Sequence, residues 1–479
     1  MDECQYWSKI IDAIEAYTFS KQQEDPNFFY YNGENFIAAF ERVVYFEIIG
    51  KRDYIESIEL AMDNKQLIFV DTLIHKEILC FAYPDYLFNT KKRIFKSSVK
   101  KIIYSNKFFI NSFYRFKNIL KKDETLSKHY NNIFISIHHK FIRYLAPLYL
   151  ELDSVVFIIC DDIERSVELC TEHDYNYVLM PNKGSLSNLP SKSITTLAIL
   201  YERACATLYL TNPTLIVVPE GNAPIYEVFN LASKTLGKKV VCIQQGWSPI
   251  YHNGFRNMHY DLFLSWGDEF SNLLQQYNPN QKFVAVGNYV LNSCAANQRG
   301  DSISFFLQSV SVIISENIFQ QLLIFAGWVA SQFPEQKIIL REHPSKPLSR
   351  EFKQTLLKYE NISIMSPETH SLHDVLSLTK IAISIYSTVL IEATQYGAIP
   401  FIFNPTAMSN YEPDFSKDGV GLEVKNIEDG KKIITLLLRD NVLFDYYAKA
   451  METKKGIYFK HIGDEAIKAA IEEIEGLYK

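Results

Sequence analysis

The sequence predicts an α/β protein of two Rossmann-like domains that face each other across a cleft. Its 479 residues are too many for one ordinary core, and a hydrophobic content of 47% is enough to bury two. Short β-rich apolar runs alternate with helical patterns along the chain, which is typical of parallel sheets built from βαβ units. A small, polar, aperiodic stretch at 292–302 indicates a linker between two such series.

The elements follow in two series, one on each side of this linker. The clearest strands of the first series are expected at 65–71, 154–160, 214–220, 238–246 and 260–267, and those of the second at 309–315, 336–344, 361–366, 380–387 and 398–404. Residues 463–479 predict an amphipathic helix with an apolar stripe of Ala466, Ile467, Ala470, Ile471 and Ile474. We therefore expect an N-terminal domain over 1–293, a C-terminal domain over 303–450, and a C-terminal helix over 451–479.

The composition excludes several classes of protein. The formal net charge is −6, whereas nucleic-acid binders are strongly basic, so no nucleic-acid partner is expected. The seven cysteines are scattered and never spaced as CxxC, which predicts neither a disulfide framework nor a zinc site. The amino terminus lacks a signal-peptide core, and no run of about 18 apolar residues occurs. These features predict a cytoplasmic protein.

Motifs of several common chemistries are missing from the sequence. It contains no GxxxxGK[ST] phosphate loop, no GxGxxG after a strand, no GxSxG and no HExxH. It also lacks DxD, the carboxylate pair with which metal-dependent sugar transferases hold a divalent ion on a nucleotide diphosphate. No metal and no resident cofactor are therefore expected, and the cleft between the domains is the expected site.

A histidine stands at the end of a predicted strand in the second domain. Pro344 disfavours the α region for His343, so the chain leaves the strand in extended form. A side chain placed there lies beyond the carboxyl end of the sheet, where open α/β sheets bind ligands. The alternative is an ordinary surface-loop histidine.

Hydroxyl groups follow another strand of the same sheet. Ser384, Ser387 and Thr388 precede a helix expected from about Val389 to Gly397. A helix N-terminus with free N–H groups and nearby hydroxyls is a ready phosphate site, although plain N-capping explains the same residues. Together with the histidine, these hydroxyls predict one phosphate site in the C-terminal domain.

An acid ends a strand in the first domain. Glu220 is followed by Gly221 and Asn222, and the glycine allows a tight turn and a close approach of substrate to the backbone. A partly buried carboxylate that faces a phosphate site across the cleft is suited to act as a general base for an attacking hydroxyl. An exposed turn acid is the alternative.

These motifs together resemble the bacterial GT-B glycosyltransferases that include sialyltransferases, polysialyltransferases and Kdo transferases, with CDP-glycerol phosphotransferases as relatives. The resemblance covers roughly residues 210–410 and consists of a strand-terminal acid-glycine, a His-Pro and a hydroxyl pair before a helix. It implies a GT-B fold with an acceptor-side N-terminal domain and a nucleotide-sugar-binding C-terminal domain.

The resemblance also implies roles for individual residues. Glu220 would be the general base, and His343, Pro344, Ser387 and Thr388 would lie at the nucleotide phosphate. A carboxylate holds the ribose hydroxyls in this family, for which Asp374 is the best match and Glu368 the second. The family often has two acids before the glycine and serine as the second hydroxyl, whereas this chain has Pro219-Glu220 and Thr388.

The acceptor side is inferred from residues that follow other strands. Gln245, Gly246 and Trp247 should line it, because amide and indole surfaces suit sugars, although Trp247 is equally compatible with a core position. Asp161 and Asp162 end a further strand and are the reserve candidates for the base. Their alternative role is to cap the following helix.

The implied activity is a metal-independent, inverting glycosyl transfer. The donor would be a CMP-activated ulosonic acid such as sialic acid or Kdo, and the acceptor a surface glycan or glycolipid of the capsule or lipopolysaccharide type. Three alternatives remain open: a CDP-polyol phosphotransferase, a UDP-sugar transferase or epimerase, and a non-catalytic scaffold. The phosphotransferase would need a second basic residue, for which His252, His259 and Arg341 are candidates.

The segment 91–122 is strongly basic within an acidic protein and contains no acid. Lysines flank one apolar, aromatic face that consists of Phe95, Val99, Ile102, Phe109, Phe113, Phe116 and Leu120. Basic amphipathic helices of this kind bind anionic bilayers, so peripheral association with the inner membrane face is expected. An ordinary core face with a solvated lysine rim is the alternative.

Overall fold

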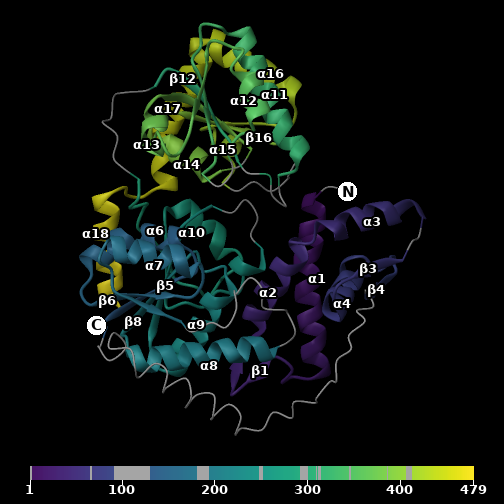
Figure 1. The fold of residues 1–479 in the computed structure, drawn as a ribbon, viewed down its shortest axis with the longest axis vertical. Coiled ribbons are helices and arrows are strands. Elements are labelled where there is room, and N and C mark those ends of the chain that lie inside the picture. Colours follow the sequence, from purple (N-terminus) through teal and green to yellow (C-terminus); the bar gives the residue numbers. More distant parts are fainter. Residues whose placement is uncertain are drawn as a thin grey trace.

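The computed structural model describes residues 3–64, 67–90, 130–180, 194–247, 252–291, 300–308, 310, 314–344, 347–385, 387–405 and 413–478. Two α/β domains lie one above the other in Figure 1, and a helical region formed by the first part of the chain lies beside the lower one. Each α/β domain has a parallel sheet with helices on both faces, as the alternating pattern of the sequence predicts.

The N-terminal α/β domain is built on a sheet of seven parallel strands within the described residues, in the order β11-β10-β9-β8-β5-β6-β7. Strands β5, β6 and β8 are buried along their whole length, which explains the continuous apolar sequences of β6 and β8, whereas β5 has the polar Asn132 and Ser136 at its ends. The strands are β5 Asn132–Ser136, β6 Val155–Ile159, β7 Tyr177–Leu179, β8 Leu215–Pro219, β9 Lys239–Ile243, β10 Leu262–Ser265 and β11 Phe283–Ala285. The helices are α6 His139–Glu151, α7 Ile163–Glu172, α8 Ile194–Thr211, α9 Pro224–Thr235 and α10 Asp268–Gln275.

The C-terminal domain contains six parallel strands in the described residues, in the order β14-β13-β12-β15-β16-β17. They are β12 Ser302–Phe306, β13 Ile338–Arg341, β14 Ile362–Met365, β15 Thr379–Ser384, β16 Ile399–Phe403 and β17 Leu422–Val424. The helices are α11 Glu316–Gln332, α12 Arg350–Leu356, α13 Leu372–Ser377, α14 Thr388–Gln395, α15 Phe415–Asp418 and α16 Ile427–Arg439.

The first strand of this domain differs from the prediction. It is β12 at 302–306, whereas the sequence analysis expects a strand at 309–315, most of which lies outside the described residues. The β12 sequence SISFF contains two serines and so lacks the continuous apolar run of a buried strand. Ser304 is nevertheless buried, and its hydroxyl forms a hydrogen bond with Thr379 Oγ1 at 2.7 Å. Most of the expected linker, residues 292–299, also lies outside the described residues.

The N-terminal helical region was not anticipated as a separate layer. Its strand β3, within the expected strand 65–71, pairs with β4 in a small sheet of its own instead of joining the large sheet. A fully buried ion pair, Arg42 Nη1 to Glu227 Oε2 at 2.9 Å, connects α2 of this layer to α9. The elements are α1 Glu3–Glu24, β1 Tyr30–Tyr31, β2 Glu34–Asn35, α2 Ile37–Ile49, α3 Arg52–Asn64, β3 Ile68–Val70, α4 Leu73–Ala82 and β4 Phe88–Thr90.

The chain returns to the N-terminal domain at its end. After α17 Asn441–Tyr458, the backbone N–H of Asn288 donates to the carbonyl of His461 at 3.0 Å, and α18 Asp464–Gly476 then packs on α6 (Figure 1). Ala466, Ala470 and Ile474 of the predicted stripe are buried in the core of the N-terminal domain, which confirms the amphipathic helix. None of the helices in the described ranges combines the length and apolar content needed to cross a bilayer.

Candidate functional site in the cleft between the domains

The topology of the first sheet places several predicted residues at one edge. Strands β9, β8, β5 and β6 are neighbours and run parallel, so the residues that follow them meet at the same carboxyl edge. Gln245 and Trp247 follow β9, Glu220 follows β8, and Asp161 and Asp162 follow β6. The structure therefore brings the predicted acceptor-side residues and both sets of candidate bases together.

Glu220 occupies a strained turn. Its φ is +61°, and the N–H of Gly221 donates to the carbonyl of Pro219 at 2.7 Å, which closes a γ-turn with Glu220 at its centre. A left-handed conformation costs a non-glycine residue on the order of 1–3 kcal/mol and is concentrated at functional sites. Burial raises the pKa of the Glu220 carboxyl, and the nearby Lys140 ammonium opposes that rise.

Two glycines, Gly221 and Gly246, shape the backbone around the Glu220 carboxylate. A Cβ at position 221 would lie 2.6 Å from Cys242 Sγ, and φ is +73° there, so only glycine fits. A Cβ at position 246 would lie 3.2 Å from Glu220 Oε1, so Gly246 leaves room beside the acid. The buried Tyr260 hydroxyl donates to the Gly221 carbonyl at 2.8 Å and so holds the backbone of the turn in place.

The segment after β9 forms one wall of a pocket beside Glu220. Gln244 anchors it from inside: its Oε1 accepts from Trp266 N at 2.9 Å and its Nε2 donates to the Gly246 carbonyl at 3.2 Å. The polar lining of the pocket consists of Glu220, Gln244 and Gln245, and Gly246 and Trp247 complete this wall. Trp247 is half-buried: it packs against the hydrophobic core, with its ring centroid 6.3 Å from that of Phe415.

The facing side of the cleft is the start of α14. Ser387 is the N-cap and accepts from Val389 N at 3.4 Å, as the sequence predicts. Thr388 Oγ1 accepts from the backbone N–H of Trp247 at 3.3 Å, a hydrogen bond that joins the two domains. In this state of the protein, the predicted phosphate-binding hydroxyl and the predicted acceptor wall are therefore in direct contact.

His343 lies near the end of β13, and β12 separates that strand from β15. Two strand spacings put the two strand ends about 10 Å apart, a distance that a diphosphate or a nucleoside phosphate can bridge. Burial lowers the pKa of His343, so its neutral imidazole can donate one hydrogen bond to a phosphate oxygen. Pro344 beside it is exposed.

Comparison with known proteins gives the architecture a name. No known family profile matches the chain, and no curated protein matches it in sequence. Among solved structures, a UDP-N-acetylglucosamine 2-epimerase is similar with a TM-score of 0.51 and 14% identity over 73% of this chain and 96% of the other. The UDP-GlcNAc 2-epimerase from Neisseria meningitidis, solved with UDP-GlcNAc bound, has a TM-score of 0.51 and 13% identity over 72% and 99%. The fold is GT-B.

The charges of the two acids predicted to hold a ribose act on Arg341 at the end of β13 in this GT-B structure. Asp374 forms a capping box with Ser371, accepting from its N–H at 2.8 Å and its hydroxyl at 2.7 Å. Those bonds lower the pKa of Asp374, and a side-chain hydrogen bond from Ser366 lowers the pKa of the exposed Glu368. Both predictions remain untested by a bound nucleotide.

The sequence analysis missed a carboxylate closer to the GT-B cleft. Glu392 lies one helical turn after Thr388 on α14, so the two side chains share a face of the helix. Burial raises the pKa of Glu392 to about 7, and its charge, like that of Glu220, acts on the Tyr144 hydroxyl of the other domain. The signal was available, because Glu392 is at position i+4 from Thr388, one of the hydroxyl residues predicted at the phosphate site.

The structure assigns other roles to two of the extra basic candidates. His252 is buried, stacks on Tyr45 with ring centroids 4.4 Å apart, and accepts from Gly254 N; burial lowers its pKa to about 3. His259 pairs with Glu227 Oε1 at 2.8 Å. Arg341 is only 8% exposed, and its Nη1 has no hydrogen-bond partner among the described residues.

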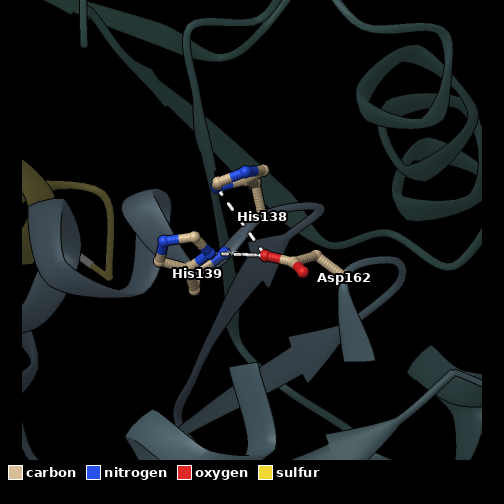
Figure 2. Close-up of side chains that lie close together, drawn as sticks. All are labelled: His138, His139 and Asp162. Carbon is tan, nitrogen blue, oxygen red and sulfur yellow. Dashed lines mark hydrogen bonds and ion pairs between the residues drawn. The ribbon is translucent and has the colours of Figure 1, made fainter. Parts of the chain in front are cut away.

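A histidine pair was also missed. His138 and His139 follow β5, the unpredicted central strand, and Figure 2 shows both beside Asp162. Asp162 occupies the N-cap position of α7 but makes no capping hydrogen bond; its carboxylate instead bonds His139 Nδ1 at 2.6 Å. The capping role considered for Asp162 is therefore wrong.

Proposed function

We propose that the protein is a GT-B glycosyltransferase that moves a sugar from a nucleotide donor, held by the C-terminal domain, to a hydroxyl group of an acceptor held by the N-terminal domain. One observation carries the proposal. A half-buried acid in a strained turn, Glu220, lies beside the 244–247 wall that touches the start of α14 through the bond between Trp247 and Thr388. A candidate base and a candidate phosphate site thus face each other across one cleft.

On the acceptor side, Glu220 would take the proton of the attacking hydroxyl. Its carboxylate makes no hydrogen bond or ion pair to any described residue, so its lone pairs are available to a substrate. The raised pKa brings it closer to neutral pH and makes it a better proton acceptor than an ordinary carboxylate. Gln245, Gly246 and Trp247 would orient the acceptor sugar against it.

On the donor side, the leaving phosphate would lie at the N-terminus of α14. The free N–H groups there and the Ser387 and Thr388 hydroxyls would donate to its oxygens, and His343 would donate from the end of β13. Binding requires the bond between Trp247 and Thr388 to open, so the donor would separate the two domains locally. Glu392 on the same helix face would accept from donor hydroxyl groups.

Two donor classes fit this arrangement. The motif resemblance supports a CMP-linked ulosonic acid, and transfer to a glycan or glycolipid acceptor with inversion follows from it. The similarity in fold to a 2-epimerase solved with UDP-GlcNAc supports testing UDP-sugars alongside, for transfer and for epimerisation. We take the CMP-linked donor as the first hypothesis because Glu220-Gly221, His343-Pro344 and Ser387 occur together.

A second candidate function, transfer of a polyol phosphate from a CDP-linked donor, is favoured by Arg341. Such a reaction needs a further cation at the transferred phosphate, and Arg341 at the end of β13 is buried with an unpartnered Nη1. Among the three basic candidates, it is the one that the structure leaves without a competing hydrogen bond or ion pair at that atom.

Nucleotide-induced thermal stabilisation tests the proposal first. CMP, CDP and UDP are compared at equal concentration, because a ligand that binds the folded state raises the unfolding midpoint by an amount that increases with the logarithm of its affinity. The matching nucleotide sugar is then supplied and its consumption measured. Stabilisation by none of the three would contradict the proposal, and binding without consumption of any donor would favour a non-catalytic scaffold.

A further inference from the structure

The cluster of His138, His139 and Asp162 has the composition of a metal site. The two histidines belong to the loop and first turn after β5, and Asp162 follows β6, the adjacent parallel strand (Figure 2). One ligand atom from each of the three residues lies within 4.8 Å of the others. Among the described residues this is the one group of three or more such side chains that meets this spacing.

The distances leave a position between the three atoms. Asp162 Oδ2 is 2.6 Å from His139 Nδ1 and 3.8 Å from His138 Nδ1. Ligand atoms around a tetrahedral zinc ion lie about 3.3 Å apart, since Zn–N and Zn–O bonds are about 2.0–2.2 Å long. These two separations lie on either side of that value, and all three ligand atoms lie within 4.8 Å of one another, so side-chain rotation would be needed to bring them to one ion.

The carboxylate of Asp162 is directed to the histidines and not to helix α7. Asp162 has a φ of +47°, in the left-handed region that aspartate adopts more readily than most residues. Its carboxylate turns away from the N–H groups of α7 and accepts from both the N–H and Nδ1 of His139, at 3.1 and 2.6 Å. A requirement for N-capping would not produce this arrangement, because capping is the bond that Asp162 fails to make.

We propose that His138, His139 and Asp162 bind a divalent transition-metal ion, best matched by zinc. Two imidazole nitrogens and one carboxylate oxygen are ligands that zinc prefers, and three protein ligands leave a fourth position open. His138 Nδ1 accepts a hydrogen bond from Lys140 N at 3.2 Å as the N-cap of α6, and this bond would open when the nitrogen's lone pair goes to the ion. The ion would take the place of the proton between His139 Nδ1 and Asp162, and that proton would leave to solvent or move to Nε2.

Solvent can reach the cluster from the cleft edge. The side chains of His138, His139 and Asp162 are 43%, 20% and 24% exposed, so an ion and a fourth ligand have access. The cluster follows β5, the strand next to β8 from which Glu220 projects. If the proposed function holds, on which this step rests, the open position would bind an acceptor oxygen on the N-terminal side of the cleft. A metal at this cluster would correct the expectation of a metal-free site, which rests on the absence of DxD and so on an ion held by the donor.

Cobalt and zinc binding to the full-length, tag-free protein test the proposal. After treatment with a chelator, Co²⁺ is added and visible absorption is recorded, and Zn²⁺ affinity is measured by calorimetry. We expect one ion per chain with the intense bands of a four-coordinate site, displaced by Zn²⁺. His139→Ala and Asp162→Asn should each weaken zinc binding at least tenfold, since even changes to residues that support ligands cost about 10–100-fold.

His173→Ala is the matched control, because it removes an exposed histidine of the same domain outside the cluster. Its affinity should equal that of the wild type, and circular dichroism should show that all variants fold. Equal zinc affinity in wild type, His139→Ala and Asp162→Asn, or no binding by the wild type, would overturn the proposal. The readout needs no donor, so loss of the metal site and failure of the transferase assignment are distinguishable.

Discussion

Glu220 and Glu392 are carboxylates of different domains that act on the same buried hydroxyl, that of Tyr144. Both have raised pKa values because burial disfavours their charged forms. Such groups lower the stability of the folded state at neutral pH and are retained where a ligand uses them. At the scale of single residues, the two buried carboxylates are therefore expected to lower the free energy of unfolding at neutral pH, while they provide groups that a ligand can use.

Glu392→Gln should reveal this cost as a function of pH. The folded-state pKa is about 7 and the ordinary value 4.5, so the folded protein holds more protons between them and its stability falls as pH rises through that window. The stability of the variant should not fall in this way, because glutamine does not titrate. We expect it to match the wild type near pH 4.5 and to exceed it above pH 7 by on the order of 1–3 kcal/mol.

The measurement is the thermal-unfolding midpoint of ligand-free protein across this range. Glu472→Gln, which changes an exposed glutamate on α18, is the control and should follow the wild type throughout. A constant difference between Glu392→Gln and wild type at every pH would show that Glu392 titrates normally.

At the scale of elements, the start of α14 combines capping with proposed phosphate binding, and a variant can separate the two. Ser387→Ala and Ser349→Ala each remove an N-cap serine, from α14 and α12 respectively. Both should lose about 0.5–2 kcal/mol of stability. Only Ser387→Ala should also weaken nucleotide binding, by about 10- to 150-fold, because a charge-assisted hydrogen bond contributes roughly 1.5–3 kcal/mol.

Calorimetry with the stabilising nucleotide checks this difference, and His343→Ala should weaken binding in the same way. If Ser387→Ala binds as tightly as Ser349→Ala, the serine is only a cap. If His343→Ala also binds normally, the histidine is a loop residue and the phosphate site lies elsewhere.

The turn after β8 depends on a hydroxyl beneath it. Tyr260→Phe removes the hydrogen bond to the Gly221 carbonyl and should let the strained turn relax. Turnover should then fall roughly tenfold while donor affinity stays unchanged, because misplacement of a base affects the reaction more than binding. Tyr201→Phe, which removes another buried tyrosine hydroxyl bonded to Thr235, is the matched control. Equal turnover in the two variants would show that Tyr260 does not position the base.

At the scale of the whole molecule, the sequence predicts the two parallel α/β domains because nearly every strand is an apolar run. The exceptions are short strands that contain buried polar residues. Asn132 and Ser136 in β5 and Ser304 in β12 are buried, and they interrupt the apolar pattern. Missing β5 also meant missing His138 and His139, whose placement depends on that strand.

The candidate site was predictable where residues follow clear strands, as with Glu220, His343 and Ser387. It was not predictable where the interaction joins residues of different domains. Examples are the electrostatic interaction of Glu392 with Tyr144 and the hydrogen bond of Thr388 with Trp247. Periodicity and spacing describe local structure, whereas such contacts depend on how the two domains pack. For the same reason, the ion pair of Arg42 with Glu227 was not predicted, because it depends on how α2 packs on α9.

Membrane association stays a prediction, since residues 91–122 lie outside the described residues. We expect the wild type to co-sediment with anionic liposomes at low salt and to be released at high salt. Reversal of Lys91, Lys92, Lys100 and Lys101 to Glu should abolish sedimentation. Reversal of four exposed lysines of the C-terminal part, Lys358, Lys425, Lys432 and Lys449, changes net charge equally and should not. Equal sedimentation of both variants would contradict a specific role of the segment.

Sugar transfer by Glu220→Gln tests the central claim most directly. Glutamine preserves the size of the side chain in the turn but cannot accept the proton, so turnover with the active donor should fall about 100-fold or more. Nucleotide affinity should stay within about twofold of the wild type, because Glu220 belongs to the opposite domain. Glu164→Gln, an exposed acid on α7, should keep full activity. Wild-type turnover in Glu220→Gln would contradict the assignment of Glu220 as the base and with it the proposed arrangement of the cleft.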